Sequence, residues 1–387
     1  MPTTSYWLED DRSELPRSTQ IARPDVIVVG GGVTGCSCAL TLAEQGVRVQ
    51  LHEARDIAGG ASGRNGGFAL RGAATPYDLA RDAYGRDAAR RLMALTESAV
   101  DRLEELAGDA FRRVGSLRVA LGAAERDALR REHDALREDG FAVEWLDELP
   151  APLDRLYDGA LLHPPDGVLQ PARWVRRLAA HAVAAGADVR LGSRADLGSL
   201  EADAVIVAAD GFTASLLPEL ADVVVATRGQ VLVTEPVAPI RYARPHYARD
   251  GYDYWHQLAD GRLVIGGSRD AALDEERTNV EATTSVVQER IEDLAAALLE
   301  ERPRITHRWA GIWGTTPDQA PLVGPVPGRE NVWIAGGYSG HGNVLGLACG
   351  DLVARALLGE HLPELELFDP ARPQLGLRVS ADAAPAA

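Results

Sequence analysis

Lysine is absent from the 387-residue sequence, so arginine and histidine supply all of its basic side chains. Without a side-chain amine there is no Schiff base, which excludes ordinary pyridoxal-phosphate catalysis, and there is no P-loop lysine to bind phosphates. The formal net charge is −17. Because an acidic surface repels a phosphate backbone, we expect no nucleic-acid partner.

Cysteine is scarce, and long apolar runs are missing. Cys36, Cys38 and Cys349 show neither a CxxC spacing nor a histidine cluster, so we expect no disulfide framework and no metal site, only small residues that fill the core. No apolar run is long enough to cross a bilayer, and residues 1–20 lack the apolar core of a signal peptide. We therefore expect a cytoplasmic protein without membrane association. The oligomeric state is not indicated.

Residues 25–53 have the pattern of a parallel β–α–β unit. An apolar β-branched run at 25–29 predicts a strand, and three glycines end it. An Ala- and Leu-rich helix is expected at 36–45, and a second strand at 47–53.

The turn of this unit carries the spacing Gly30-x-Gly32-x-x-Gly35. Such glycines permit a tight turn, close approach of the backbone to a pyrophosphate, and close packing of the helix on the strand. The helix N-terminus then offers N–H groups to the phosphates. Glu53 ends the second strand, where a carboxylate accepts hydrogen bonds from ribose hydroxyls. This context predicts a dinucleotide site.

A second glycine-rich loop follows closely and reads Gly-Gly-Ala-Ser-Gly-Arg-Asn-Gly-Gly-Phe over residues 59–68. Its glycines permit close backbone approach to a flat ligand and supply N–H donors. A simple NAD-binding unit does not need such a loop at this place. The loop therefore favours FAD over NAD, with a flexible surface loop as the alternative.

Further elements are less regular. From Gly229 onward the alternation changes to that of an antiparallel sheet, with a turn at Asp260-Gly261. We expect strands at 111–121, 141–146, 188–191, 204–209, 230–234, 262–265 and 332–335, and helices at 123–137, 171–185, 280–299 and 343–358.

The chain resembles the D-amino-acid-oxidase-like superfamily of FAD-dependent oxidoreductases, nearest the γ-glutamylputrescine oxidase and glycine oxidase branches. The run from Ala61 to Gly67 is most similar to the first of these branches. The other similar segments are Ser5-Tyr6-Trp7, Gly167–Pro171, Val205–Gly211, Arg228-Gly229-Gln230, Trp309–Gly324 and Gly336–Gly342.

The resemblance implies an α/β fold: a glutathione-reductase-like, Rossmann-type FAD-binding domain with an inserted α+β substrate domain on a mostly antiparallel sheet. We expect residues 1–20 to form a polar N-terminal arm and 373–387 a flexible tail. The FAD-binding domain would comprise 21–85, 155–228 and 305–372, and the substrate domain 86–154 and 229–304.

FAD is the implied cofactor, and its predicted contacts lie in the two glycine-rich segments, after the strand at 204–209, and in the C-terminal run. There, a helix N-terminus aimed at the flavin would stabilise the negative charge that forms on reduction. The predicted contacts are Gly30, Gly32, Val33, Thr34, Gly35, Glu53, Ala54, Arg55, Gly60, Ala61, Ser62, Arg64, Asn65, Gly66, Gly67, Phe68, Ala208, Ala209, Gly211, Gly311, Gly337, Tyr338, Ser339, Gly340, His341 and Gly342.

Three positions depart from the relatives. Trp313 stands where amino-acid oxidases of the superfamily place the arginine that binds the substrate α-carboxylate, and an indole cannot replace that contact. Arg241, Arg244 or Arg308 are alternative sources of such a contact. Gly311 and Arg64 replace residues that attach flavin covalently in relatives, so we expect dissociable FAD. Val264 replaces a lysine that promotes reaction with oxygen, which leaves the electron acceptor open.

Four side chains are predicted to act on the substrate. Tyr254 and Trp255 belong to an aromatic cluster with Tyr252 and His256, in which alternation places Trp255 on the opposite face. This cluster suits an amine's alkyl chain or cation, with a sheet-face core as the alternative. The third is Trp313, which suits an apolar or cationic group, with core packing as the alternative. The fourth, His341, is a hydrogen-bond donor to flavin, a substrate contact or a structural histidine.

The predicted function is oxidation of a small primary or secondary amine. Hydride leaves the α C–H of the neutral amine for flavin, the imine is hydrolysed to an aldehyde, and oxygen, or another acceptor, takes the electrons to give hydrogen peroxide. One alternative is an oxidase or dehydrogenase of glycine, sarcosine or a D-amino acid. A non-catalytic flavin-binding redox sensor or assembly partner is the alternative from another class.

Overall fold

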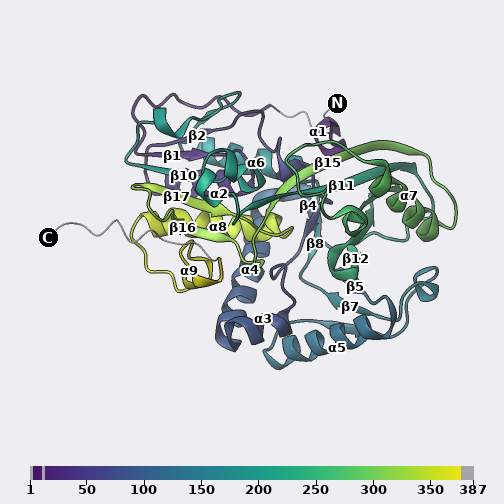
Figure 1. The fold of residues 1–387 in the computed structure, drawn as a ribbon. Helices are drawn as coiled ribbons and strands as arrows, with labels where there is room; N and C mark the ends of the chain where they lie inside the picture. Colours follow the sequence, from purple (N-terminus) through teal and green to yellow (C-terminus); the bar gives the residue numbers. More distant parts are fainter. Residues whose placement is uncertain (1–2, 11–13, 376–387) are drawn as a thin grey trace. The chain divides into compact units, whose positions relative to one another are not determined.

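The computed structural model describes residues 3–10 and 14–375 and contains two compact units (Figure 1). Unit 1 comprises the described residues of Met1–Arg12, Gly60–Trp174 and Thr227–Ile312. Unit 2 comprises those of Ser13–Gly59, Val175–Ala226 and Trp313–Ala387. The functional domain boundaries expected from the sequence remain a prediction, and the expected tail lies mostly outside the described residues.

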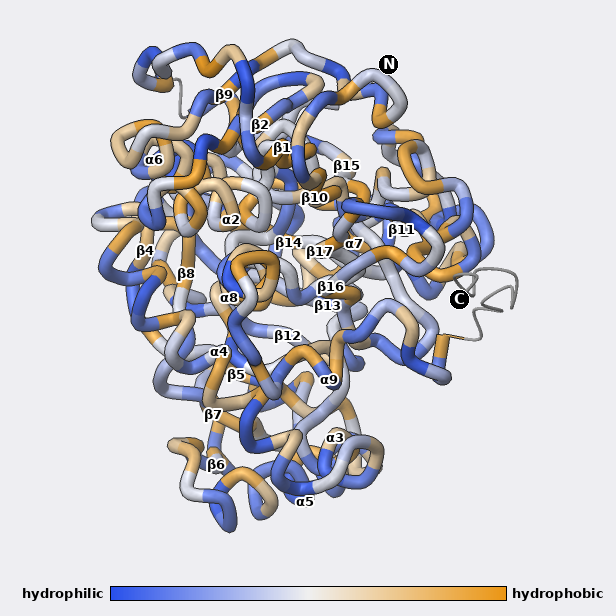
Figure 2. The backbone as a smooth tube through the Cα atoms, turned by 90° about the vertical axis from the view of Figure 1, so that its left-hand side faces the viewer, coloured by the Kyte–Doolittle hydropathy of each residue, from blue (hydrophilic) through white to orange (hydrophobic). Residues whose placement is uncertain are grey.

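Unit 2 is built on a six-stranded sheet. Its strands pair in parallel, except for an edge strand that runs antiparallel to its neighbour. Its central strands read VIVV and AVIV and are fully buried, as expected for a parallel sheet covered on both faces, and they are coloured as hydrophobic in Figure 2. The order is β16 (Leu322–Pro325), β17 (Val332–Gly336), β10 (Ala204–Val207), β1 (Val26–Val29), β2 (Val49–His52) and β9 (Asp188–Arg190).

Two helices of unit 2, α2 (Val33–Glu44) and α8 (Gly342–Leu357), pack against each other at glycines. A Cβ atom on Gly350 would lie 2.4 Å from the carbonyl oxygen of Thr34. The three cysteines are fully buried on these helices, which confirms their prediction as core-filling residues. The chain continues from α8 to a short helix, α9 (Leu365–Phe368), and α6 (Pro171–Ala184) precedes β9.

Unit 1 contains an eight-stranded sheet and a three-stranded sheet. Strands β11 and β14 pair antiparallel, which confirms the change of pattern read from Gly229 onward. The larger sheet has the order β15 (Ile305–Thr315), β11 (Val225–Pro236), β14 (Arg262–Gly267), β13 (Asp253–Gln257), β12 (His246–Ala248), β5 (Ser116–Val119), β7 (Ala160–His163) and β6 (Glu144–Leu146). The smaller has the order β3 (Phe68–Ala69), β8 (Gly167–Leu169) and β4 (Phe111–Arg113).

The helices of unit 1 cover these sheets with amphipathic surfaces. The sequence of α5 is mostly hydrophilic, and α5 is drawn largely in blue in Figure 2; it buries Leu129, Glu132 and Leu136 at spacings of three and four residues. Among the described residues, no helix is both long enough and apolar enough to cross a membrane. The helices are α1 (Tyr6–Asp10), α3 (Tyr77–Tyr84), α4 (Arg86–Ala107), α5 (Gly122–Glu138) and α7 (Ser285–Leu299).

The two faces of the eight-stranded sheet differ in chemistry. On one face, Trp255 and Ile265 pack with Ile291 of α7 in a hydrophobic core. We call the opposite face of these strands the polar face. Cross-strand pairing and alternation place the following side chains on it: Ser116, Arg118, His163, Tyr247, Tyr254 and His256.

Three elements differ from the sequence prediction. Helix α7 begins at Ser285 rather than at 280, because the N–H of Thr284 donates to the side chain of Gln230 and holds the preceding segment extended. The expected strand at 111–121 divides into β4 and β5 of different sheets at Gly115, which has a positive φ of 73°. The expected polar arm contains α1, whose Trp7 is 1% exposed and stacks on His256.

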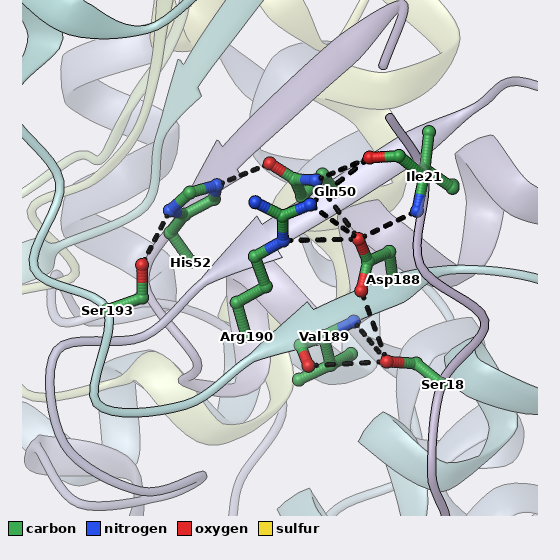
Figure 3. A network of polar contacts seen from close by, with 8 residues as sticks. All are labelled: Ser18, Ile21, Gln50, His52, Asp188, Val189, Arg190 and Ser193. Carbon is green, nitrogen blue, oxygen red and sulfur yellow. Dashed lines mark hydrogen bonds and ion pairs between the residues drawn. The ribbon is translucent and has the colours of Figure 1, made fainter. Parts of the chain in front are cut away.

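A buried polar network joins β2 and β9 in unit 2 (Figure 3). The carboxylate of Asp188 accepts hydrogen bonds from the N–H of Ile21 and from Nε2 of Gln50, each at 3.0 Å, and pairs with Arg190 at 3.1 Å. Gln50 in turn lies 2.6 Å from Nε2 of His52. Burial alone would raise the pKa of Asp188, but these donors hold it below its usual value.

We expect Asp188→Ala to lower the free energy of unfolding at pH 7 by about 3 kcal/mol, because several buried donors lose their acceptor. The folded-state pKa of Asp188 is depressed, so its contribution is present above the unfolded-state pKa and is lost as pH falls through the folded value. Urea unfolding at pH 7 and near pH 3 should therefore show a smaller difference between variant and wild type in acid. The control is Asp196→Ala, which removes only an exposed cap and should cost at most about 1 kcal/mol.

Candidate active site

The glycine turn after β1 is closely packed on both sides. Gly30 has a positive φ of 120°, and a Cβ atom there would lie 2.4 Å from the carbonyl oxygen of Ala208. A Cβ atom on Gly35 would lie 1.9 Å from the carbonyl oxygen of Gly30. Only glycine fits either position, so α2 can begin directly above the end of β1.

Glu53 is fixed at the end of β2 by backbone donors. One carboxylate oxygen accepts the N–H of Gly31 and the other accepts the N–H of Arg55, both at 2.7 Å. Each oxygen keeps a lone pair for a further donor. Gly32, at the N-cap of α2, has no side chain that could fill the space in front of the first turn. This is the geometry that a dinucleotide requires: an orientated carboxylate beside an open helix N-terminus.

A second turn in unit 2 connects β17 to α8. Tyr338 places its hydroxyl 2.8 Å from Oγ1 of Thr34, which links this turn to the first turn of α2. The N–H of Ser339, a residue with a positive φ of 51°, donates to the carbonyl oxygen of Gly314 at 2.9 Å. His341 lies at the N-cap of α8. Residues predicted from two distant glycine-rich segments are thus in contact.

Asp210 holds this turn from below and was not predicted. Its carboxylate accepts the N–H of Gly337 at 2.9 Å and that of Gly314 at 3.1 Å, so it joins the end of β15 to the β17–α8 turn. Burial raises the pKa of Asp210 even though backbone donors oppose the shift. An acidic residue directly after the strand at 204–207 was the available signal.

Most of the predicted cofactor contacts lie in unit 2, together with two of the four residues predicted to act on the substrate, Trp313 and His341. The cofactor contacts in this unit are Gly30, Gly32, Val33, Thr34, Gly35, Glu53, Ala54, Arg55, Ala208, Ala209, Gly211, Gly337, Tyr338, Ser339, Gly340, His341 and Gly342.

The second glycine-rich loop belongs to unit 1 and is braced by side chains. The indole N–H groups of Trp7 and Trp309 donate to the carbonyl oxygens of Asn65 and Arg64 at 2.8 and 2.9 Å. Asn65 bonds back to Ala61 and Ser62 and accepts the N–H of Gly67. The loop is therefore a fixed structure and not a flexible surface loop.

Arg64 of this loop has a side chain directed into the protein. Its Nη1 atom donates to the carbonyl oxygens of Thr3 and Ala310 at 2.7 and 3.1 Å. Gly311 on β15 lies against it, since a Cβ atom there would be 2.9 Å from Cβ of Arg64. The unit 1 residues among the predicted contacts are Gly60, Ala61, Ser62, Arg64, Asn65, Gly66, Gly67, Phe68 and Gly311.

The aromatic cluster on β13 alternates as predicted. Tyr254 packs its ring against Gly66, where a Cβ atom would be only 3.0 Å away, and against Phe68. His256 also contacts Phe68. Trp255 points to the opposite face, is fully buried, and packs between Tyr157 and His246. A substrate contact by Trp255 is therefore corrected to the core packing that was its alternative.

Several side chains on the polar face are buried without hydrogen bonds. His256 is 1% exposed and His163 is 5% exposed. Neither imidazole has a hydrogen-bond partner within the part of the chain that the structure describes. Burial lowers the pKa of His256 to about 3 and that of His163 well below its usual range, so both rings are neutral at pH 7. Buried polar groups of this kind are typical of ligand-binding surfaces.

Other expected sources of a carboxylate contact lie elsewhere. Arg241 pairs with Glu300, and Arg308 pairs with Glu292. Trp313 is half-buried on β15. Arg118 on the polar face was missed, although its position two residues after Ser116 in a strand is a signal for a shared face.

The residues of the two glycine turns of unit 2 fit FAD. The carboxylate of Glu53 suits the ribose, and the first turns of α2 and α8 offer N–H groups to anionic oxygens. Among the described residues, no group of three or more histidine, cysteine, aspartate or glutamate side chains could hold a metal ion.

Comparison with known proteins agrees with this geometry. The model of the family described as "FAD dependent oxidoreductase" matches residues 25–356. The chain is 29% identical to the probable oxidoreductase OrdL of Rhizobium meliloti, over 92% of this chain and 88% of that protein. It is equally identical to the gamma-glutamylputrescine oxidoreductase of Escherichia coli, over 92% and 89%.

A solved structure shows the same fold. Glycine oxidase from Geobacillus kaustophilus superposes with a TM-score of 0.71 at 22% identity, over 94% of this chain and 100% of that chain. The expected superfamily and the mixed α/β fold with a Rossmann-type FAD-binding domain are thereby confirmed.

Proposed function

Because this chain belongs to the family of FAD-dependent oxidoreductases, we propose that it oxidises the C–N bond of a small primary or secondary amine. The observation that carries this proposal is the substitution at position 313. The half-buried indole of Trp313 donates one N–H and accepts none, so it suits an apolar or cationic group and not an α-carboxylate. The similarity to an oxidoreductase of gamma-glutamylputrescine supports an amine substrate.

FAD is part of the same proposal. We assign its pyrophosphate to the N-terminus of α2 around Gly32, and its ribose to Glu53. The turn at Gly337–Gly342 and the loop at Ala61–Gly67 supply the remaining contacts predicted from the sequence. We also propose that FAD is dissociable, that oxygen takes up the electrons, and that the enzyme is cytoplasmic.

FAD, when bound, accepts the two electrons and the hydride that leave the amine carbon. The protein supplies position and a neutral polar surface. Burial raises the pKa of Tyr254 to about 12 and lowers that of His256 to about 3, so both side chains are uncharged at pH 7. Such a surface favours the neutral form of the amine, which is the form that can be oxidised.

An anaerobic titration tests this function. Addition of primary and secondary amines to the purified holoenzyme should remove the flavin absorbance near about 450 nm, with about two electrons taken up per site. Glycine, sarcosine and D-alanine serve as the comparison series, since bleaching by these alone would favour an amino-acid oxidase. Admission of air should restore the colour. A flavin that no amine or amino acid bleaches would contradict the proposal and favour a non-catalytic flavoprotein.

A further inference from the structure

Arg118 lies at the centre of the polar face of unit 1. It follows Ser116 on β5 and is the cross-strand neighbour of Tyr247 on β12. Its guanidinium carbon lies 5.3 Å from the centre of the Tyr247 ring. The side chain is 11% exposed, so water covers little of it.

Arg118 uses little of its hydrogen-bonding capacity. Of its five N–H donors, one bonds to the carboxylate of Glu132, and no other hydrogen bond joins it to the described residues. Asp250 lies 3.9 Å away and is 82% exposed, so solvent screens that pair. Glu132 is itself held by the N–H of Tyr77. The guanidinium is thus fixed on one edge and has donors left on the others.

The neighbours of Arg118 also have unused donors. The hydroxyl groups of Tyr247 and Tyr254 make no hydrogen bond to the residues that the structure describes, and cross-strand pairing places the two tyrosines side by side. His163 lies diagonally from Arg118 on the neighbouring strand, because Arg118 pairs with Leu161. Its two ring nitrogens are buried and lack a partner among these residues. Donors prevail on this part of the polar face.

We propose that Arg118, Tyr247 and His163 form a subsite that binds a carboxylate of the substrate. A guanidinium with a free edge pairs with a carboxylate through parallel hydrogen bonds, and a phenol and an imidazole add single donors. The subsite rests on the proposed function in one respect: the same molecule carries the amine that is oxidised.

The position of this subsite defines the substrate class. Tyr254, which packs on the Gly66 backbone, lies on β13, and Arg118 lies two strands away. Two strand spacings correspond to about 9.5 Å. A carboxylate on the α-carbon is too close to the amine for this separation. We infer an extended aminocarboxylate, with several bonds between its amine and its carboxylate.

The test compares probes that differ only in the two end groups. Linear ω-amino acids from 4-aminobutyrate to 8-aminooctanoate are compared with alkylamines of equal length for flavin reduction under anaerobic conditions. Hexanoate, which has no amine, measures the carboxylate alone through the thermal midpoint and the flavin absorbance of the holoenzyme. We expect the best ω-amino acid to have an apparent affinity about 10- to 100-fold higher than its alkylamine.

The variant is Arg118→Met combined with Glu132→Gln, which removes both charges and leaves no unpaired buried carboxylate. It should lose the advantage of ω-amino acids and the binding of hexanoate, while its reduction by alkylamines stays within about twofold. Tyr247→Phe, which should fold normally, is expected to reduce the advantage by a smaller factor, about three- to tenfold. The matched control is Arg241→Met, since Arg241 pairs with Glu300 at the edge of the same unit.

The outcomes separate the subsite from the proposed function. Wild-type protein that does not bind hexanoate, or a double variant that keeps the preference for ω-amino acids, would overturn the subsite. Reduction by alkylamines without any carboxylate preference would leave the proposed function intact and reject the subsite. Hexanoate binding that depends on Arg118, in a protein that no amine reduces, would support the subsite and reject amine oxidation.

Discussion

Replacement of Gly35 with alanine is expected to yield protein with little or no FAD and with a free energy of unfolding lowered by about 3 kcal/mol or more. The added Cβ atom would lie 1.9 Å from the carbonyl oxygen of Gly30, which is backbone and cannot rotate away. Helix α2 must therefore move off β1, and its first turn moves with it. We expect the dissociation constant for FAD to rise at least about 100-fold, as measured by fluorescence titration of the apoprotein.

A matched control is Gly198→Ala. The nearest atom to a Cβ there is a side-chain oxygen of Asp196 at 3.7 Å, and Gly198 does not have a positive φ. This variant should bind FAD as the wild type does. Full FAD affinity in Gly35→Ala would contradict the assignment of this turn to the cofactor.

The second large effect is expected at Glu276. Its side chain is 1% exposed and pairs with Arg228 at 2.7 and 2.9 Å, while Nε2 of Gln230 donates to the same carboxylate at 2.9 Å. Glu276→Ala leaves a buried guanidinium without its partner. We expect the free energy of unfolding to fall by about 3–5 kcal/mol, measured by urea denaturation.

The adjacent Glu275 provides the control. It is 57% exposed and lies 3.8 Å from the same arginine. Surface pairs of this kind contribute little, so Glu275→Ala should change stability by at most about 0.5 kcal/mol. Equal losses in the two variants would show that the buried pair has no special weight.

The sequence predicted the dinucleotide half of the molecule well because its signals are local. A β-branched run, three glycines and an acidic residue at the end of the next strand lie within residues 25–53, and each is tied to one physical requirement. The helix still begins at Val33, three residues earlier than expected. The glycine at position 35 hides the first turn from a reading based on helix propensity.

The polar face could not be assembled from the sequence in the same way. Arg118, Tyr247 and Tyr254 come from three strands, two of them more than 100 residues apart in the chain. Their register depends on pairing that no short pattern encodes. The split at Gly115 concealed Arg118 further, since the expected strand at 111–121 spanned two different sheets.

Long-range side-chain contacts explain the remaining differences. Trp7 is buried because His256 and the loop carbonyl of Asn65 receive it. The acidic residues around it suggested only a solvated arm. The start of α7 at Ser285 depends on Gln230, a residue on another element. The sequence alone shows neither partner.

The strand order of unit 2 has a consequence for synthesis of the chain. Strand β10 lies between β1 and β17, and β17 begins only at Val332. On the ribosome, one side of β10 must therefore wait, unpaired and apolar, while about 125 further residues are translated. At ordinary elongation rates of about 5–20 residues per second, this wait lasts several seconds or more. Nascent chains of this protein are thus candidates for chaperone binding, and a stop codon before β17 should produce aggregates and not a smaller folded domain.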